Sequence, residues 1–184
     1  MDTPLAYFIT FTCYGTWLHG DERGSVDDEH NAPGTPVLQP DSRRCARERD
    51  ELAGPPYLLD QPRRQVTLDA LCEIARRKGW LLHAAHVRSN HVHLVVTAGG
   101  PPERVMNDFK TVASRCLNRE FLAERNRKRW TRHGSTRYLW TEDAVAEKVY
   151  YVLHEQGEPM ERFPIAEPSL PPRAEPSRAR SAAE

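Results

Sequence analysis

Residues 91–97 read His-Val-His-Leu-Val-Val-Thr, and this alternation constrains the fold more than any other segment of the chain. In a β-strand, side chains at positions i and i+2 project from the same face, so His91 and His93 lie side by side. The apolar residues Val92 and Leu94 then share the opposite face, which we expect to pack against helices. The segment therefore predicts a strand with one apolar face and one face that carries two imidazoles.

The elements expected around this strand indicate an α+β domain. In chain order they are a strand at 7–12, a helix through 68–75 that stops at Gly79, strands at 80–87 and 91–97, a helix from 102 to about 124, a strand at 135–140 and a helix from 142 to about 156. Before the last helix the order is β-α-β-β-α-β. This order predicts a ferredoxin-like split β-α-β fold, an antiparallel sheet with helices on one face, extended by a C-terminal helix.

Two segments depart from this regular pattern. Residues 19–65 are rich in Pro, Gly, Asp and Arg and predict a long irregular insertion after the first strand, with a short helix near 42–52. From residue 159 onward Pro, Glu, Ala, Ser and Arg predominate, which predicts a disordered tail. We therefore expect one domain over residues 1–158 and a tail over residues 159–184.

Composition excludes several classes of protein. No stretch reaches the roughly 18 consecutive apolar residues that a membrane helix needs, and the first residues lack a signal-peptide pattern. We therefore expect a cytoplasmic protein that does not contact the membrane. The 4 cysteines form no C-x-x-C pair, so they predict incidental or buried thiols rather than a zinc or redox motif.

Charge is balanced overall, with 26 basic and 26 acidic residues, but it is unevenly distributed. Residues 102–140 contain ten Lys or Arg against four Asp or Glu, a net charge of +6. Such a stretch indicates a surface that binds nucleic acid, although a solvated helix face has the same pattern. The residues predicted to contact nucleic acid are Lys110, Arg115, Arg119, Arg127, Lys128, Arg129 and Arg137.

Three aromatic residues in or near the basic stretch are candidates for stacking on unpaired bases. They are Trp130, Tyr138 and Trp140. The alternative for each of them is packing in the core, which we favour for Trp140.

The last helix offers a phenol and a candidate third ligand for a metal ion bound by His91 and His93. On a helical wheel Val149, Val152 and Leu153 form a buried stripe with Val145, while Tyr151 and Glu155 share a flank beside Lys148. Glu155 is therefore the first candidate for a third metal ligand next to the two histidines. Gln156, which falls toward the buried stripe, is the second. The alternative is that Tyr151 is a boundary aromatic and Glu155 an ordinary surface acid.

The segment Asn90-His91-Val92-His93-Leu94 resembles the HUH motif, in which one apolar residue separates two histidines. Over about residues 5–157 the chain resembles the single-tyrosine HUH transposases of insertion sequences and the REP-associated tyrosine transposases. The segments that support this resemblance are 7–12, Phe109-Lys110, 137–140 and Tyr150-Tyr151-Val152.

The resemblance implies a chemistry for these residues. His91 and His93, with a residue from the tyrosine helix, would bind Mg²⁺ or Mn²⁺; the family usually has an amide at the position of Glu155. Tyr151 would cleave single-stranded or hairpin DNA through a 5′-phosphotyrosine and then transfer the strand. Tyr150 is the reserve nucleophile. A homodimer is expected if the chain acts like the insertion-sequence members, which share helices.

Two other functions remain open from the sequence. One is a domesticated relative that binds nucleic-acid hairpins without cutting them. The other is a metal-dependent phosphoesterase that uses water, so that its turnover would survive the loss of Tyr151.

Overall fold

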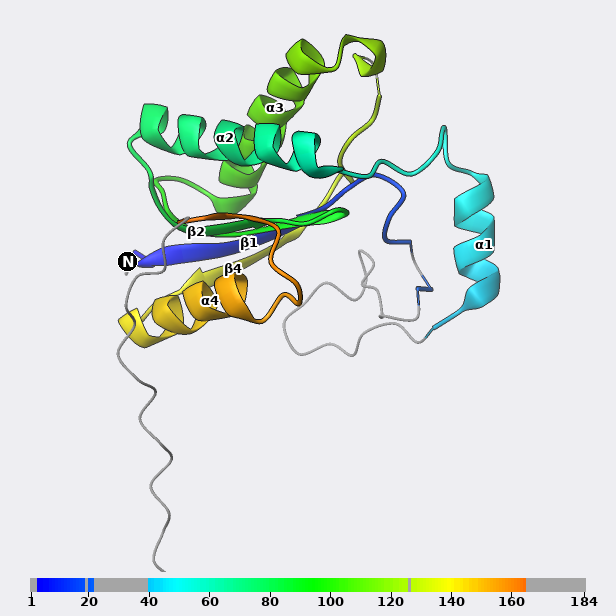
Figure 1. Ribbon diagram of the computed structural model, residues 1–184. Coiled ribbons are helices and arrows are strands. Elements are labelled where there is room, and N and C mark those ends of the chain that lie inside the picture. The colour runs from blue at the N-terminus through cyan, green and yellow to red at the C-terminus, as the bar shows by residue number, and fades with distance from the viewer. Residues whose placement is uncertain (1–2, 19, 22–39, 126, 165–184) are drawn as a thin grey trace, which may run out of the picture.

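A five-stranded antiparallel sheet forms the centre of the molecule in the computed structural model, which describes residues 3–18, 20–21, 40–125 and 127–164 (Figure 1). Its strands are β1 (Ala6–Thr12), β2 (Leu81–Val87), β3 (His91–Thr97), β4 (Ser135–Leu139) and β5 (Glu161–Phe163), in the spatial order β4-β1-β3-β2-β5. The helices are α1 (Ser42–Asp50), α2 (Gln61–Lys78), α3 (Pro102–Glu120) and α4 (Glu142–His154), with a short 3₁₀ helix at Leu122–Glu124. The order β1-α2-β2-β3-α3-β4 confirms the predicted ferredoxin-like split β-α-β pattern.

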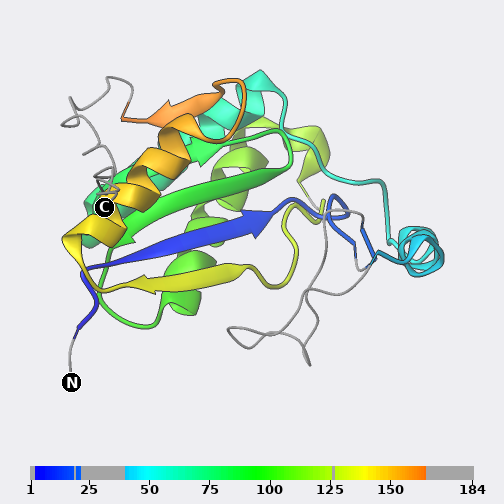
Figure 2. The ribbon, with the colours of Figure 1, turned by 90° about the horizontal axis from the view of Figure 1, so that it is seen from below.

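Helices cover both faces of the sheet. Helices α2 and α3 lie together on one face, as the ferredoxin-like pattern predicts, and α4 lies alone on the other face (Figures 1 and 2). The larger core contains Val92, Leu94 and Val96 of β3 under α2 and α3, which confirms the predicted apolar face of this strand. The smaller core holds Phe8 and Val95 under α4.

The helix ends follow local sequence signals. Asp60 caps α2 by accepting a hydrogen bond from the backbone N–H of Arg63, and Gly79 ends it in the left-handed conformation at φ 67°. Thr141 caps α4 by accepting from the N–H of Ala144 at 3.2 Å, which confirms the predicted start of this helix.

One predicted boundary of the insertion was wrong. The irregular segment after β1 ends at Asp60 rather than at residue 65, because α2 already begins at Gln61. The short helix expected near 42–52 is present as α1, whereas residues 19 and 22–39 of the insertion lie outside the described residues.

Residues 161–163 fall in the segment predicted to be disordered, yet they form β5 and pair with β2. Strand β5 was missed because three residues show no alternation and owe their structure to backbone pairing. Residues 165–184 of the predicted tail lie outside the described part of the chain.

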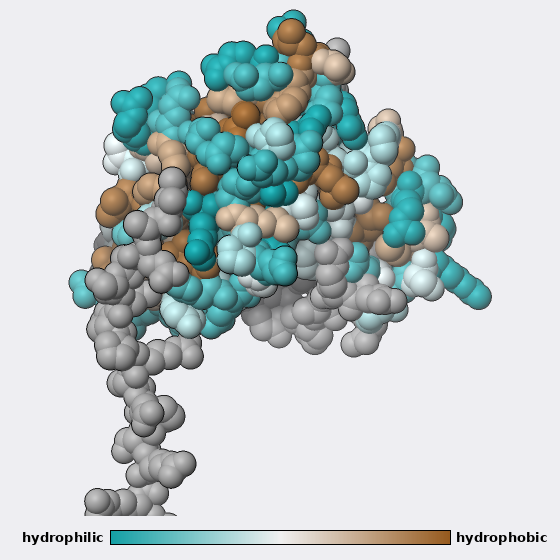
Figure 3. Space-filling view, in the orientation of Figure 1, coloured by the Kyte–Doolittle hydropathy of each residue, from teal (hydrophilic) through white to brown (hydrophobic). Residues whose placement is uncertain are grey.

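The visible surface of the described residues is largely hydrophilic, with hydrophobic areas interspersed (Figure 3). None of the helices in the described ranges has both the length and the apolar character needed to cross a bilayer.

The assigned core predicts a contrast between two leucines. Leu94→Ala should lower the free energy of unfolding by about 2–5 kcal/mol, because Leu94 is fully buried and its truncation leaves a cavity. Leu58→Ala is the matched control: Leu58 is 59 % exposed, and a change below about 0.5 kcal/mol is expected. Urea unfolding followed by circular dichroism measures both, and equal losses would contradict the assigned core.

Candidate active site

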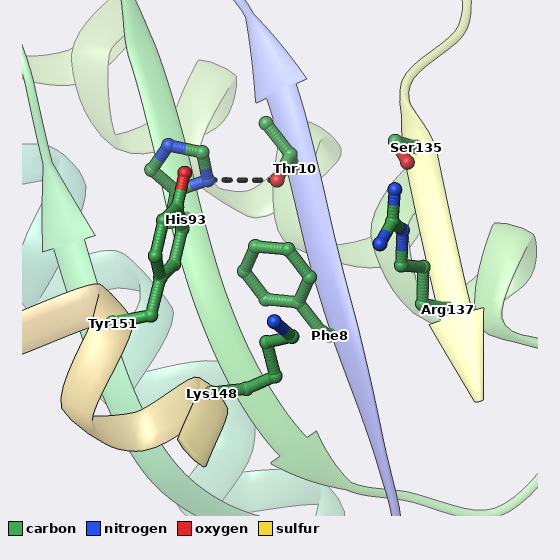
Figure 4. Close-up of a pocket in the computed structure, with 7 residues that line it drawn as sticks. All are labelled: Phe8, Thr10, His93, Ser135, Arg137, Lys148 and Tyr151. Carbon is green, nitrogen blue, oxygen red and sulfur yellow. Dashed lines mark hydrogen bonds between the residues drawn. The ribbon is translucent and has the colours of Figure 1, made fainter. Parts of the chain in front are cut away.

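The two histidines of β3 lie next to each other on the face covered by α4. Their ring centroids are 4.6 Å apart. The Nδ1 of His91 donates to the Oδ1 of Asn90 at 2.7 Å, since a carbonyl oxygen only accepts. The Nδ1 of His93 is hydrogen-bonded to the hydroxyl of Thr10, its cross-strand partner on β1, at 2.7 Å (Figure 4). Each ring is therefore oriented by a neighbouring polar group.

Burial keeps His93 neutral. Its side chain is 8 % exposed, and desolvation, followed by the nearby charges of His91 and His86, lowers its pKa from 6.5 to about 3. A hydrogen bond with the side chain of Gln156 acts in the opposite direction and is outweighed. A neutral imidazole is the form that binds metal ions, so His93 is in the right state to act as a ligand at neutral pH.

Helix α4 brings Tyr151 to the histidine pair. Val149, Val152 and Leu153 are buried against the sheet, which turns the half-buried Tyr151 toward β1 and β3. Its ring centroid lies 5.8 Å from that of His93, at an interplanar angle of 73°. In Figure 4 the hydroxyl of Tyr151 points toward the imidazole of His93. The structure thus places the predicted tyrosine beside the predicted histidine pair.

A pocket of about 320 Å³ opens beside Tyr151 and His93. The other residues that line it are Phe8, Thr10, Ser135, Arg137 and Lys148. The Nζ of Lys148 lies 5.5 Å from the centroid of the Tyr151 ring, and Arg137 lines the pocket from β4 (Figure 4). Two cationic side chains around a phenol suit this pocket to an anionic group such as a phosphate.

Phe8, Thr10 and Ser135 were not predicted as site residues. They face the pocket because Thr10 pairs with His93 on one side and with Ser135 on the other. Strand register of this kind cannot be read from one sequence, so the only available signal was that a strand at 7–12 was expected.

Glu155, the first choice for the third ligand, lies just beyond the last residue of α4. Helix α4 ends at His154, and Glu155 is an exposed C-cap residue with φ −106° and ψ 17°. Among the described residues, no three His, Cys, Asp or Glu side chains lie close enough together to hold a metal ion. The helical wheel that grouped Glu155 with Tyr151 extends one residue beyond the observed helix.

The second choice, Gln156, does lie at the pair. Its side chain is hydrogen-bonded to His93, and its Nε2 donates to the carbonyl of Tyr151 at 3.3 Å. The donor groups that meet here are thus two imidazoles and one amide.

Lys110, predicted to contact nucleic acid, is a buried structural residue instead. Its Nζ donates to the backbone carbonyls of Thr131 at 3.0 Å, Arg132 at 3.4 Å and His133 at 3.0 Å. Burial lowers the pKa of its ammonium to about 8. Lys110 therefore fixes the loop that leads into β4 and cannot reach a nucleic acid.

Arg129 is also buried, which corrects the same prediction. It is 3 % exposed, and its guanidinium donates to the Oδ1 of Asn118 at 2.7 Å and to the carbonyl of Glu124 at 3.0 Å. These bonds hold the chain that follows α3 and leave no surface for a ligand.

The other predicted basic contacts are accessible but do not all share the face of Tyr151. Arg115 and Arg119 are exposed on α3, across the sheet from α4. Arg127 is half-buried over the ring of Tyr57, and Lys128 is exposed over the ring of Tyr14. Only Arg137 lines the pocket.

Two of the three candidate stacking residues, Trp130 and Trp140, have the opposite burial from that expected. Trp130 is buried, and its Nε1 donates to the Oγ of Ser114 at 2.9 Å, so it belongs to the core. Trp140, expected in the core, is 53 % exposed and stacks on the 49 % exposed Tyr138 at 5.9 Å. The exposed pair lies at the end of the edge strand β4.

Comparison with known proteins identifies the family of this chain. The model of a family described as IS200-like transposases matches residues 57–155, which is more than half of the chain. The chain belongs to this family, and its general function is that of a transposase. The matched range contains the histidine pair and Tyr151.

Two solved structures are similar to the chain at low sequence identity. A REP-associated tyrosine transposase bound to a REP hairpin has 10 % identity and a TM-score of 0.44, over 83 % of this chain and 67 % of that one. A candidate transposase from Deinococcus radiodurans R1 has 15 % identity and a TM-score of 0.43, over 83 % of this chain and 91 % of that one. A search of curated proteins gives no match.

The low pKa of His93 predicts a specific pH dependence. In the folded protein its ¹⁵N imidazole signals should stay those of a neutral ring when the pH falls from 7 to about 5, because the pKa is about 3. In urea the same ring should titrate near 6.5. The unfolded chain then binds a proton that the folded chain does not, so this residue lowers stability progressively as the pH falls through this window. An imidazolium signal from folded His93 at about pH 5 would contradict the burial described.

Proposed function

We propose that this chain cuts and rejoins single-stranded DNA, with Tyr151 as the nucleophile beside a divalent cation held by His91, His93 and Gln156. The observation that carries the proposal is the shared pocket, in which the phenol of Tyr151 meets a neutral histidine and two cationic side chains. A phosphodiester offers the charge that these cations attract and the phosphorus that a phenolate attacks.

The donor groups fit a divalent cation such as Mg²⁺ or Mn²⁺. Because Nδ1 of His91 donates to Asn90, its Nε2 carries the lone pair. The Nδ1 of His93 is hydrogen-bonded to Thr10, so a cation would take Nε2 of this ring and replace the hydrogen bond between His93 and Gln156. Outer partners of this kind are typical of metal-binding histidines. The amide oxygen of Gln156 supplies a hard donor. When bound, the cation would polarise an oxygen of the scissile phosphate.

The chain's own residues account for the remaining steps. Lys148 and Arg137 hold the phosphate from two sides of the pocket. The Oη of Tyr151 forms a bond to phosphorus, and the bond from phosphorus to the 3′ oxygen breaks. The phenol gives up its proton to water as its oxygen bonds to phosphorus, and the leaving 3′ oxygen takes up a proton, so the products are a 5′-phosphotyrosine and a free 3′-hydroxyl. The Nζ of Lys148 lies 5.5 Å from the centroid of the Tyr151 ring, so its charge stands beside the attacking group.

A candidate stacking surface for unpaired bases lies at the same edge of the sheet as Arg137 but on the opposite face, because Tyr138 contacts Tyr7 of the larger core. This surface is the exposed pair of Tyr138, on the edge strand β4, and Trp140, just after the strand ends at Leu139. Aromatic rings contribute about 1–3 kcal/mol per stacked base without sequence preference. We therefore infer that the substrate is single-stranded where it passes this edge of the sheet, as beside the stem of a hairpin.

Two adjacent tyrosines provide the test of the nucleophile. Tyr151→Phe should reduce covalent protein–DNA adduct on labelled hairpin oligonucleotides with Mn²⁺ by at least about a thousandfold, because the attacking oxygen is gone. Tyr150→Phe, at the 36 % exposed neighbouring position, should leave adduct formation within about twofold of the unchanged chain. Gel electrophoresis measures the adduct and mass spectrometry maps it. An adduct on Tyr150 would overturn the assignment, and tight hairpin binding without any adduct would favour a binding protein.

A second pair of neighbours tests the third ligand. Gln156→Ala should weaken Mn²⁺ binding by about 10–100-fold, because the amide at the histidine pair is lost. Glu155→Ala should change the affinity little, since this carboxylate is exposed at the end of α4. Electron paramagnetic resonance of free Mn²⁺ gives both dissociation constants. The opposite order of effects would return Glu155 to the role first predicted for it.

A further inference from the structure

The pocket beside Tyr151 has two opposite walls. Helix α4 forms one wall with Tyr151 and Lys148, and the edge strand β4 forms the other with Ser135 and Arg137 (Figure 4). Residues of β1 and β3 form the floor between these walls, since the sheet order is β4-β1-β3. A group bound in the pocket therefore has the phenol on one side and β4 on the other.

This arrangement gives the two walls different roles in a displacement at phosphorus. The attacking and leaving oxygens lie roughly in line, on opposite sides of the phosphorus. Because the Oη of Tyr151 approaches from the wall of α4, the 3′ oxygen leaves toward the wall of β4. Lys148 is then the cationic residue of the attacking side, and Arg137 is the cationic residue of the leaving side.

The two faces of β4 differ in charge. Arg137 projects into the pocket. The hydroxyl of Thr136 donates to the carboxylate of Glu103 at 2.8 Å, and Tyr138 packs against the larger core, so both project from the opposite face. A carboxylate repels phosphates, whereas the exposed rings of Tyr138 and Trp140 suit bases. The pocket face of β4 thus suits the phosphate, and the other face suits unpaired bases.

Strand β4 is also an edge that a nucleic acid can pass around. Within the described residues it pairs only with β1, so its outer side presents backbone donors and acceptors to a ligand. The side chains of Ser135, Arg137 and Tyr138 are exposed along this edge. A DNA strand that leaves the pocket on this side can therefore reach the rings of Tyr138 and Trp140.

We propose that β4 is the binding site of the leaving strand. Arg137 stabilises the charge that develops on the departing 3′ oxygen, and the bases on the 5′ side of the cut stack on Tyr138 and Trp140. The inference rests on the proposed function and gives the bound DNA a direction across the sheet. Bases on the 3′ side of the cut do not contact the aromatic pair.

The step balances without a further reactant. The bond between Oη of Tyr151 and phosphorus forms, the bond between phosphorus and the 3′ oxygen breaks, and its electron pair stays on that oxygen. The guanidinium of Arg137 donates hydrogen bonds to this oxygen, but a guanidinium does not give up its proton in proteins. Water therefore supplies the proton of the new 3′-hydroxyl.

A change of leaving group tests the role of Arg137. Arg137→Gln should slow adduct formation on ordinary hairpin DNA with Mn²⁺ by about 100–1,000-fold, as expected when a donor to a developing oxyanion is removed. Sulfur in place of the 3′ bridging oxygen at the cut should reduce this loss to less than about tenfold, because a thiolate needs far less stabilisation than an alkoxide when it leaves. Both rates are compared with those of the unchanged chain on the same DNA.

Lys148→Gln is the matched control for this experiment. Because Lys148 stands on the attacking side, its loss should slow the reaction by the same factor on the oxygen and sulfur substrates. If Arg137→Gln is likewise slowed equally on both substrates, Arg137 does not act at the leaving oxygen and the proposal is overturned.

A fluorescent base locates the leaving strand without cleavage. Tyr151→Phe is bound to oligonucleotides that carry 2-aminopurine on the 5′ or the 3′ side of the bond that the unchanged chain cuts. Stacking should quench only the probe on the 5′ side, and adding Trp140→Ala should abolish this quenching. Adding Leu122→Ala instead, at a 63 % exposed position on the 3₁₀ helix, should preserve it. Quenching confined to the 3′ side would reverse the direction and overturn the proposal.

The two proposals fail in different ways. If the unchanged chain forms no adduct on any hairpin substrate, the proposed function fails, and the leaving-strand site fails with it. If adduct forms on Tyr151 while sulfur does not rescue Arg137→Gln, or while only the 3′ probe is quenched, the leaving-strand site is wrong and the proposed function stands.

Discussion

The two-faced packing of strand β3 determines the rest of the molecule. Val92 and Leu94 bury their side chains under α2 and α3. Because successive side chains of a strand point to opposite faces, the intervening residues face the other side of the sheet. His91 and His93 are those residues, so the hydrophobic core itself places two imidazoles on the opposite face. A slip of one residue in the pairing with β1 would move both histidines into the core.

Helix α4 completes this arrangement by covering the histidine face only in part. Its buried stripe packs on Phe8 and Val95 and removes most of His93 from water, which is why this ring stays neutral. The half-buried Tyr151 lies at the border of the same stripe, between packed helix and pocket. Burial, protonation state and the position of the phenol are thus consequences of one helix lying across one face of the sheet.

Periodic patterns in the sequence were sufficient to predict most of the fold and part of the site. The alternation in 91–97 and the helical stripe before Tyr151 identify residues that the structure brings together. Charge and aromaticity were poorer guides, because a single sequence does not show burial: Lys110 and Arg129 satisfy backbone carbonyls inside the protein, and Trp130 and Trp140 exchange their expected places. The pocket residues from β1 and β4 depend on strand register, which no local pattern encodes.

The most direct measurement of the central claim is a crystal structure of the chain soaked with Mn²⁺, with anomalous differences recorded at the manganese edge. We predict one strong peak between the rings of His91 and His93, within ligand distance of the side chain of Gln156 and on the same side of the sheet as the hydroxyl of Tyr151. A peak elsewhere, with neither imidazole among its ligands, would contradict the account, because the shared site of the histidines and the tyrosine would then not be a metal site.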